Sequence, residues 1–220
     1  MRRWSLRLGL AAVALLLLAT LPPLVLFRRV PPPTSAFMLR AHFADPATGR
    51  ACQTVHHHWV DAADLPREVS AAVVMAEDQR FRQHHGFDFG SIQKAVEERT
   101  RSGRVRGAST LTQQVAKNLF LWPGRSWLRK AIEAWYTVWL ELLWAKPRIL
   151  EVYLNLAQFG PCVFGVGAAA EIYFHRSARY LTPQQAALLA AVLPDPDKLR
   201  VDDPGPYTRR RAAEILSLMR

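Results

Sequence analysis

Hydrophobic residues recur every three to four positions through most of the chain after residue 60, and this spacing is typical of amphipathic helices. The segment 127–145 is the longest example, with one apolar stripe made of Leu128, Ile132, Trp135, Trp139 and Leu142. Early prolines, capping threonines and closing glycines set the boundaries of the other segments. The pattern predicts helices over 65–76, 109–121, 127–145, 147–156, 168–174, 182–193 and 207–219. The sequence therefore predicts a mostly α fold.

The best candidate for a β-strand is the segment 53–60, although three histidines interrupt its apolar residues. Histidine is a common metal ligand, but neighbouring side chains of a strand point to opposite faces. Only His56 and His58 of the three could then share a metal ion. We expect no metal site here.

The N-terminus contains a run of 20 uncharged residues, 8–27, with three arginines before it and two after it. At about 1.5 Å per residue, a helix of this length crosses the roughly 30 Å hydrocarbon core of a membrane. A cleavable signal peptide is the alternative, because the leucine-rich part is short and Pro22 and Pro23 follow it. No small-x-small cleavage site follows, so we predict a retained anchor.

We divide the chain into three parts. Residues 1–29 are predicted to form a cytoplasmic tip and a transmembrane anchor, and residues 30–50 a stalk that begins with three prolines. Residues 51–220 form one domain, for which the apolar content is ample.

Composition and charge reduce the number of functions that are compatible with the sequence. Half of the 220 residues are hydrophobic, which argues against general disorder. The formal net charge is +11, and the first 40 residues hold six arginines and no acid. The rest of the chain is only moderately basic and shows no nucleic-acid-binding motif, so we expect no nucleic-acid partner. A membrane surface or a phosphate-bearing substrate accounts for the excess of positive charge.

The segment 107–121 reads GASTLTQQVAKNLFL and predicts a helix with Ser109 as its N-cap. Its polar face carries hydroxyls, amides and one ammonium, with no acid among them: Ser109, Thr110, Gln113, Gln114 and Lys117. Such a face is suited to an anionic or sugar-like ligand. An ordinary capped amphipathic helix is the alternative, and the spacing alone leaves both open.

Two acidic residues are candidates for chemistry. Glu77 ends an apolar helix just before the turn FRQHHGFD, and a carboxylate beside apolar surface suits general acid–base work, although solvated helix ends are commoner. Glu133 lies three and four residues after Lys130 and Arg129, so it either forms an intrahelical ion pair or orients a substrate or metal. Arg125 adds a further cation that could help bind a diphosphate.

Five ordered blocks carry a resemblance to a known family. They read EDQRFRQHHGFD, GASTLTQQVAKNLFL, RKAIEAWYTVWLE, KPRILEVYLN, and GVGAAAEIYF with LTPQQAALLAAVLP. Together they resemble the signatures of the peptidoglycan glycosyltransferases, glycosyltransferase family 51, which polymerise lipid II. The sequences TSAF and FLWPGRSW resemble most the monofunctional members from Gram-negative bacteria, which have no transpeptidase domain.

The resemblance implies a two-lobed, lysozyme-like domain and an inverting displacement. Glu77 would be the general base that removes a proton from the 4-hydroxyl of the acceptor lipid II, and undecaprenyl diphosphate would leave. Glu133 would be the second glutamate of the catalytic site, with a role that stays open. The substrate-binding positions would be Ser109, Thr110, Gln113, Gln114, Lys117, Arg125, Arg129 and Lys130.

The same resemblance implies partners and a location. We expect lipid II, the nascent glycan strand, membrane lipid, and proteins of cell division or elongation as partners, with the domain on the periplasmic side of the inner membrane. A Mg²⁺ or Mn²⁺ ion at the diphosphate is compatible with the family, but no ligand cluster here demands one.

Three alternatives of different kinds stay open. The leading hypothesis is the polymerase; a lipid II-binding scaffold without activity and a glycan-cleaving enzyme are the others. Cleavage gains nothing from cations that bind a diphosphate, so Lys117 and Arg125 favour synthesis. Cys52 and Cys162 could form a disulfide in an oxidising compartment, which the sequence alone leaves open.

Overall fold

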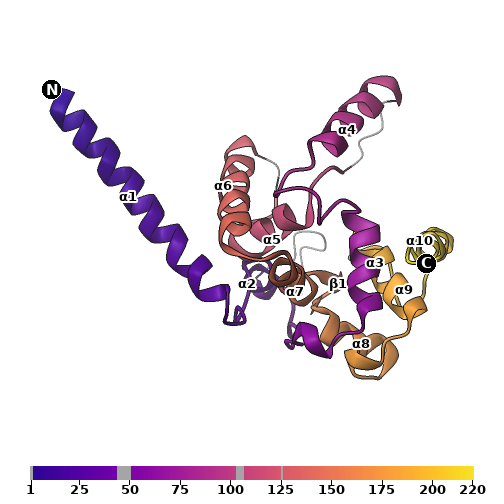
Figure 1. The fold of residues 1–220 in the computed structure, drawn as a ribbon. Helices are drawn as coiled ribbons and strands as arrows, with labels where there is room; N and C mark the ends of the chain where they lie inside the picture. Colours follow the sequence, from indigo (N-terminus) through magenta and orange to yellow (C-terminus); the bar gives the residue numbers. More distant parts are fainter. Residues whose placement is uncertain (1, 44–50, 103–106, 125) are drawn as a thin grey trace.

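The computed structural model describes residues 2–43, 51–102, 107–124 and 126–220. The described chain is mostly helical, as predicted (Figure 1). Its α-helices are α1 (Arg2–Phe27), α2 (Ala36–Phe43), α3 (Arg67–Glu77), α4 (Phe89–Ser102), α5 (Leu111–Phe120), α6 (Trp127–Leu143), α7 (Lys146–Leu156), α8 (Val166–Phe174), α9 (Pro183–Val192) and α10 (Pro206–Leu218). Two short 3₁₀ turns, η1 (Ala62–Asp64) and η2 (Ala178–Tyr180), and two strands, β1 (Gln158–Gly160) and β2 (Val163–Phe164), complete it.

The core forms around α5 and α7. Helix α5 packs against both α6 and α7, and α9 packs against α3 and α10. The fully buried side chains include Leu111 and Val115 of α5, Ile149 and Val152 of α7, and Leu189 of α9. On α5 and α7, buried apolar residues thus face a neighbouring helix, as the sequence spacing predicts. The stripe predicted on α6 is wrong: its Leu128 and Leu142 are 67% and 69% exposed, and the residues that α6 buries are Arg129, Glu133, Thr137 and Leu140.

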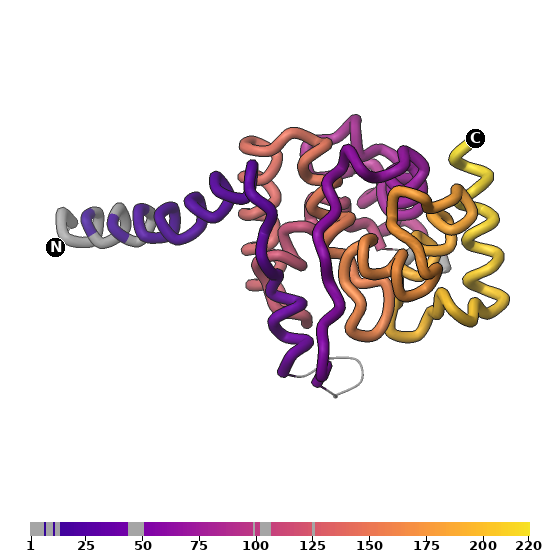
Figure 2. The backbone as a smooth tube through the Cα atoms, turned by 90° about the horizontal axis from the view of Figure 1, so that it is seen from below, coloured from indigo at the N-terminus to yellow at the C-terminus, as the bar shows by residue number. Residues whose placement is uncertain are grey.

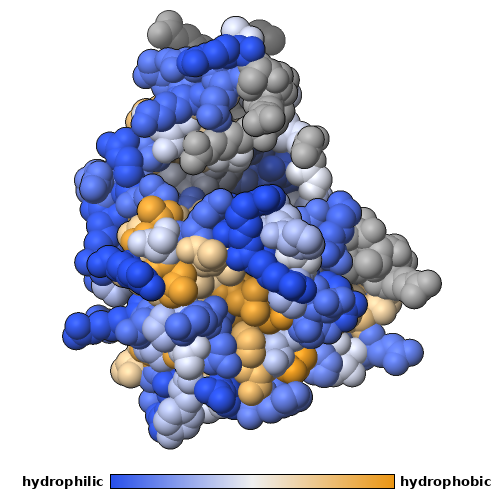
Figure 3. All heavy atoms as spheres, turned by 90° about the vertical axis from the view of Figure 1, so that its right-hand side faces the viewer, coloured by the Kyte–Doolittle hydropathy of each residue, from blue (hydrophilic) through white to orange (hydrophobic). Residues whose placement is uncertain are grey.

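The surface of the molecule on the side of α10 is mostly hydrophilic, and helix α1 extends away from the rest of the fold (Figures 1 and 3). On the side of α10, hydrophilic residues cover most of the surface and surround a smaller hydrophobic area (Figure 3). Helix α1 projects from the remainder of the molecule (Figures 1 and 2). Within the described ranges, no helix has both the length and the apolar composition that crossing a membrane requires.

The predicted helices over 65–76, 127–145, 147–156, 168–174, 182–193 and 207–219 are confirmed, with boundaries shifted by a few residues. Helices α2 and α4 were not predicted. Helix α2 lies inside the range expected to be a stalk, and it buries Met38 and Ala41 in the core.

The predicted strand over 53–60 is wrong in extent. His56 alone forms a bridge, with Val163 of the hairpin β1–β2. At the end of the segment, the backbone of Val60 pairs with a side chain and not with a strand. The buried amide of Asn155 donates to the carbonyl of Val60 and accepts from its N–H. Among the described residues, no group of three or more His, Cys, Asp or Glu side chains could hold a metal ion.

A disulfide joins Cys52 and Cys162, whose Cα atoms are 5.8 Å apart. The pairing that the sequence left open is therefore present in the structure. The bridge attaches the segment after α2 to the loop between β1 and β2.

Candidate active site

The C-terminal end of α3 carries Glu77 and connects to the start of α5. Val69, Ala72 and Val73 bury one face of α3, so that the end of the helix is fixed. The next residue, Asp78, accepts hydrogen bonds from the ring of His84 at 2.9 Å and from the backbone N–H of Leu111 at 3.0 Å. A carboxylate at the first turn of a helix also interacts favourably with its dipole.

Helix α5 begins at Leu111 and its N-cap is Thr110, so the predicted N-cap, Ser109, is wrong by one residue. Thr110 Oγ1 accepts from the N–H of Gln113, and the Gln113 side chain accepts from the N–H of Thr110 at 3.0 Å. Thr110 also donates to the carbonyl of Gly86 at 2.6 Å, which Ser109 could not do from its exposed position. This reciprocal capping box fixes the first turn of α5.

A chain of hydrogen bonds orients the Glu77 carboxylate. The amide of Gln114 donates to Glu77 Oε2 at 2.8 Å, and the hydroxyl of Tyr153 donates to the amide oxygen of Gln114 at 3.2 Å. Burial, followed by the negative charge of Glu77, raises the pKa of the Tyr153 hydroxyl well above its ordinary value, so this hydroxyl stays a donor. Arg211 lies on the other side, with its guanidinium 3.7 Å from Glu77 Oε1.

A second carboxylate, Glu133, lies among cations on α6. Its side chain is only 3% exposed, and it accepts from Arg129 at 2.8 Å and from Lys130. The ion-pair interpretation of Glu133 is therefore confirmed. Both carboxylate oxygens have cationic partners, which holds the charges of Arg129 and Lys130 at fixed positions.

Lys117 lies within electrostatic range of both carboxylates. Burial lowers the pKa of the Lys117 ammonium below its ordinary 10.5, and the charges of Glu133 and Glu77 oppose this shift. The ammonium also lies 5.5 Å from the ring centroid of Phe37 on α2. Lys117 thus connects the Glu77 end of the site to the Glu133 cluster.

Two pockets flank the hydrogen bond between Glu77 and Gln114. The first, which we name the Glu77 pocket, is lined by residues 75–80, which include Glu77, by residues 107–110, which include Ser109 and Thr110, and by Asp88, Ser91 and Lys94. The second, the Lys117 pocket, is lined by Gln114, Lys117 and Tyr153, with residues 156–158 and 193–197 on its far side. The site therefore offers a carboxylate in one pocket and an ammonium in the next.

The structure brings most of the predicted site residues together. Glu77, Ser109, Thr110, Gln114 and Lys117 line the two pockets, while Arg129, Lys130 and Glu133 form one cluster. Gln113 is different: it is 4% exposed and its side chain is used in the cap of α5. The predicted position Arg125 lies outside the described residues.

Sequence reasoning missed Tyr153 and Arg211. Tyr153 lies within the block KPRILEVYLN, so its position in a signature was a usable signal. Arg211 belongs to a run of three arginines in α10, and nothing in its spacing indicates contact with Glu77.

Comparisons with known proteins give a consistent result. Residues 46–220 match the family model described as Transglycosylase. A protein of Pasteurella multocida (strain Pm70), a biosynthetic peptidoglycan transglycosylase, is 49% identical over 202 residues, which cover 92% of this chain and 82% of that protein. Proteins of the same description from Xanthomonas campestris pv. campestris (strain B100) and Xylella fastidiosa (strain 9a5c) are each 47% identical. Their alignments cover 97% and 96% of this chain, and 87% of each relative.

Proposed function

The chain belongs to the transglycosylase family, and from this premise we propose that it polymerises lipid II into glycan strands with release of undecaprenyl diphosphate. Its domain is mostly helical and lysozyme-like, and the chain is a glycosyltransferase of peptidoglycan synthesis in the cell envelope. The substrate, the mechanism and the membrane anchor are our proposals.

The observation that carries the proposal is that Glu77 lines one pocket and accepts a hydrogen bond from Gln114, which lines the next. An inverting displacement needs the acceptor hydroxyl and the donor diphosphate on opposite faces of one anomeric carbon, with the base beside the hydroxyl. The Glu77 pocket presents a carboxylate that Gln114 orients, and the Lys117 pocket presents an ammonium that burial keeps poorly hydrated. This arrangement supports an acceptor in the first pocket and a donor in the second.

The proposed step is a single displacement with inversion. Glu77 takes the proton of the acceptor's 4-hydroxyl, and that oxygen forms a bond to the anomeric carbon of the donor sugar. The bond from this carbon to the diphosphate oxygen breaks, and the electron pair leaves with the diphosphate. Lys117 and Arg125 stabilise the departing charge, with Arg129 and Lys130 as supports.

Glu133 acts through the cations that it binds. Both of its oxygens are engaged with Arg129 and Lys130, so the described residues do not fit a protein-held divalent cation at this position. Glu133 instead positions the two cations toward a diphosphate.

We also propose that residues 8–27 anchor the chain in the inner membrane, with the domain on the periplasmic side. The run has no charged residue, and Leu15, Leu18, Val25 and Leu26 of α1 are exposed. Exposed leucines on a projecting helix are favourable in lipid and costly in water. A chain lacking residues 1–29 should move from the alkali-washed membrane fraction to the supernatant; retention in the membrane would contradict the anchor.

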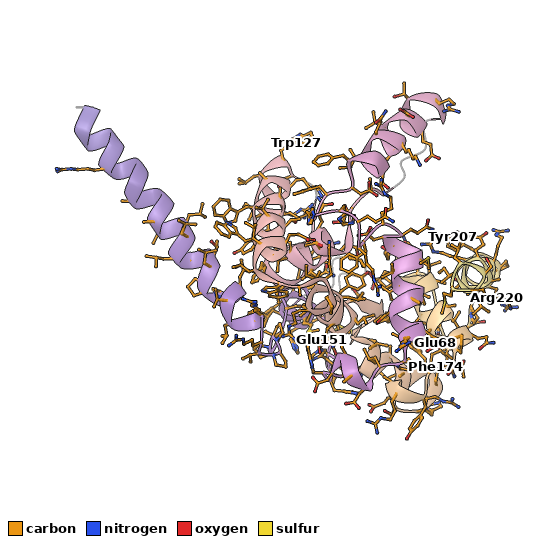
Figure 4. The ribbon with its side chains drawn as sticks, in the orientation of Figure 1. Glu68, Trp127, Glu151, Phe174, Tyr207 and Arg220 are labelled. Carbon is orange, nitrogen blue, oxygen red and sulfur yellow. A yellow bond between two sulfur atoms is a disulfide. The ribbon has the colours of Figure 1, made fainter. Side chains whose placement is uncertain are left out.

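The test of the main proposal is polymerisation of labelled lipid II by the full chain, compared with Glu77→Gln. The matched control is Glu68→Gln, because Glu68 is exposed at the opposite end of α3 (Figure 4). Long strands from wild type and control, and none from folded Glu77→Gln, are expected. Binding of lipid II without polymer would favour a scaffold, and shortening of preformed strands would favour a cleaving enzyme.

A further inference from the structure

The C-terminal end of α1 is held by side chains of the domain. The indole N–H of Trp144 donates to the carbonyl of Leu24 at 2.7 Å. The guanidinium of Arg148 donates to the carbonyl of Phe27 at 3.1 and 2.8 Å, and to that of Val30 at 2.8 Å. Two residues of the domain thus bind three carbonyls at this helix end.

Phe27 is the last residue of α1 and Val30 follows the helix, so Arg148 reaches carbonyls at and just beyond its end, while the carbonyl of Leu24 accepts Trp144 in addition to the N–H of Arg28 at 3.1 Å. The last four C=O groups of a helix have no partner within it, and together they carry a partial negative charge. A guanidinium therefore makes charge-assisted hydrogen bonds there and opposes the dipole. Leu24 is fully buried and Trp144 is 3% exposed, so the contact belongs to the packed interior.

Arg148 is itself fixed in direction. It pairs with Glu151 at 2.6 Å, and Glu151 also accepts from the backbone N–H of Ala62 at 2.9 Å. The guanidinium carbon lies 5.2 Å from the ring centroid of Trp59. In Figure 4, Glu151 lies on α7 toward the end of α1. A side chain constrained from three sides holds the helix end in one orientation.

The chain after α1 is fixed as well, although three prolines led us to expect a stalk. Pro32 is buried, and buried Ser35 accepts from the N–H of Met38 to cap α2. The N–H of Cys52 donates to the carbonyl of Ala41 at 2.8 Å. The described parts of the connection therefore pack on the domain and do not form a free tether.

We propose that Arg148 and Trp144 are positioning residues that hold α1 at a fixed angle to the active site. The inference rests on the proposed function, because an anchor at a fixed angle sets the height and tilt of the two pockets above the membrane that carries the substrate. Lipid-linked substrates then meet Glu77 and Lys117 without a search by a loosely tethered domain.

The direct test measures the angle and needs no activity. Both native cysteines are in the disulfide, so cysteines introduced at the exposed positions Ala14 and Gln184 can carry nitroxide labels. Pulsed electron resonance on the full chain in phospholipid vesicles should give one narrow distance distribution. Trp144→Phe and Arg148→Lys should each broaden it. A broad distribution in the labelled parent, or an equally narrow one in both variants, would overturn the proposal.

Activity supplies the second readout. Each variant is assayed with lipid II in the same vesicles and with a short-chain, water-soluble lipid II in detergent. We expect the vesicle rate to fall about tenfold while the soluble-substrate rate changes less than about twofold. Equal losses on both substrates would show a merely structural role and would overturn the positioning role.

Matched controls are Trp127→Phe, at the start of α6 and 92% exposed, and Arg176→Lys, whose guanidinium donates to the carbonyl of Tyr180. Both should keep the parent's distance distribution and rate ratio, and a control that broadens like Trp144→Phe would contradict the assignment. If the parent makes no polymer from either substrate, the proposed function fails, whereas the distance measurement still decides the angle.

Discussion

At the scale of single residues, the Tyr153 hydroxyl decides which atom of Gln114 faces Glu77. The hydroxyl donates to the amide oxygen, which leaves the amide nitrogen for the carboxylate. Without that donor, the amide can rotate and present its oxygen, which repels a carboxylate. The orientation of the proposed base therefore depends on a residue that does not itself contact it by a hydrogen bond.

Tyr153→Phe is expected to lower kcat about tenfold with little change in KM, because substrate binding keeps its contacts while the base loses its orientation. Its cost in stability should be about 1 kcal/mol, the usual contribution of one hydrogen bond. Steady-state kinetics and urea unfolding measure the two effects. Tyr173→Phe, at a half-buried tyrosine on α8, is the control; an unchanged kcat in Tyr153→Phe would contradict the role.

Lys117 leads to a prediction about pH. Because burial lowers its pKa below 10.5, Lys117 loses its proton at a lower pH than an exposed lysine. If its charge binds the diphosphate, kcat/KM should fall on the alkaline side below pH 10.5. In Lys117→Arg this alkaline fall should move to higher pH, since a guanidinium stays charged.

Deprotonation of Lys117 changes the stability of the folded state in the direction opposite to unfolding, so a measurement of stability distinguishes the alkaline fall in kcat/KM from loss of the folded protein. A lysine whose folded pKa is depressed makes the folded state more stable as pH rises from the folded pKa toward 10.5. Thermal unfolding followed over the same pH range therefore serves as the control. An alkaline fall that is identical in wild type and Lys117→Arg would exclude Lys117 as its cause.

At the scale of elements, two capping boxes of the same kind differ in what they hold. Thr182 caps α9 at an exposed position, while Thr110 caps α5 in the interior and also bonds to Gly86. Only the second cap positions Gln114 and Lys117. The pair allows one substitution to be compared at two sites.

Thr182→Ala should lower the free energy of unfolding by about 1 kcal/mol and leave activity unchanged. Thr110→Ala should lower it by about 2 kcal/mol, because a second buried hydrogen bond is lost, and should reduce kcat as well. Denaturant unfolding and polymerisation rates test this. Equal behaviour of the two variants would show that the cap of α5 does not position the site.

The same elements show how far the sequence alone could lead. Helices α6 and α9 were predictable in position from their apolar content and their boundary residues. The face that α6 buries was not predicted, because Leu128 and Leu142 of the predicted stripe are exposed and the helix buries polar residues around Glu133 instead.

Helix α4 was not predictable, since its residues are mostly polar, and segment 53–60 failed as a strand because its partner is the amide of Asn155. Contact of Arg211 with Glu77 depends on α10 packing beside α3, which no local pattern reveals.

At the scale of the whole molecule, the disulfide closes a loop of the chain that contains the predicted site residues. Cys52 and Cys162 are 110 positions apart, and every residue predicted for the site lies between them. Closing so long a loop restricts the unfolded chain strongly. Cys52→Ser with Cys162→Ser should therefore lower the free energy of unfolding by about 2–5 kcal/mol.

Urea unfolding of the double variant, beside wild type with and without reductant, measures that loss. Reduced wild type should match the double variant, and oxidised wild type should be more stable than both. Unfolding midpoints that coincide for all three would show that the bridge adds nothing to stability.

The bridge also bears on when the protein becomes resistant to degradation. Cytoplasmic thiols stay reduced, so a chain that remains there lacks the bond and is unfolded for a larger share of the time. A domain delivered to an oxidising compartment acquires the bond and with it protection from proteolysis. Delivery and survival are thereby coupled: copies that fail to be exported are the ones that quality-control proteases remove first.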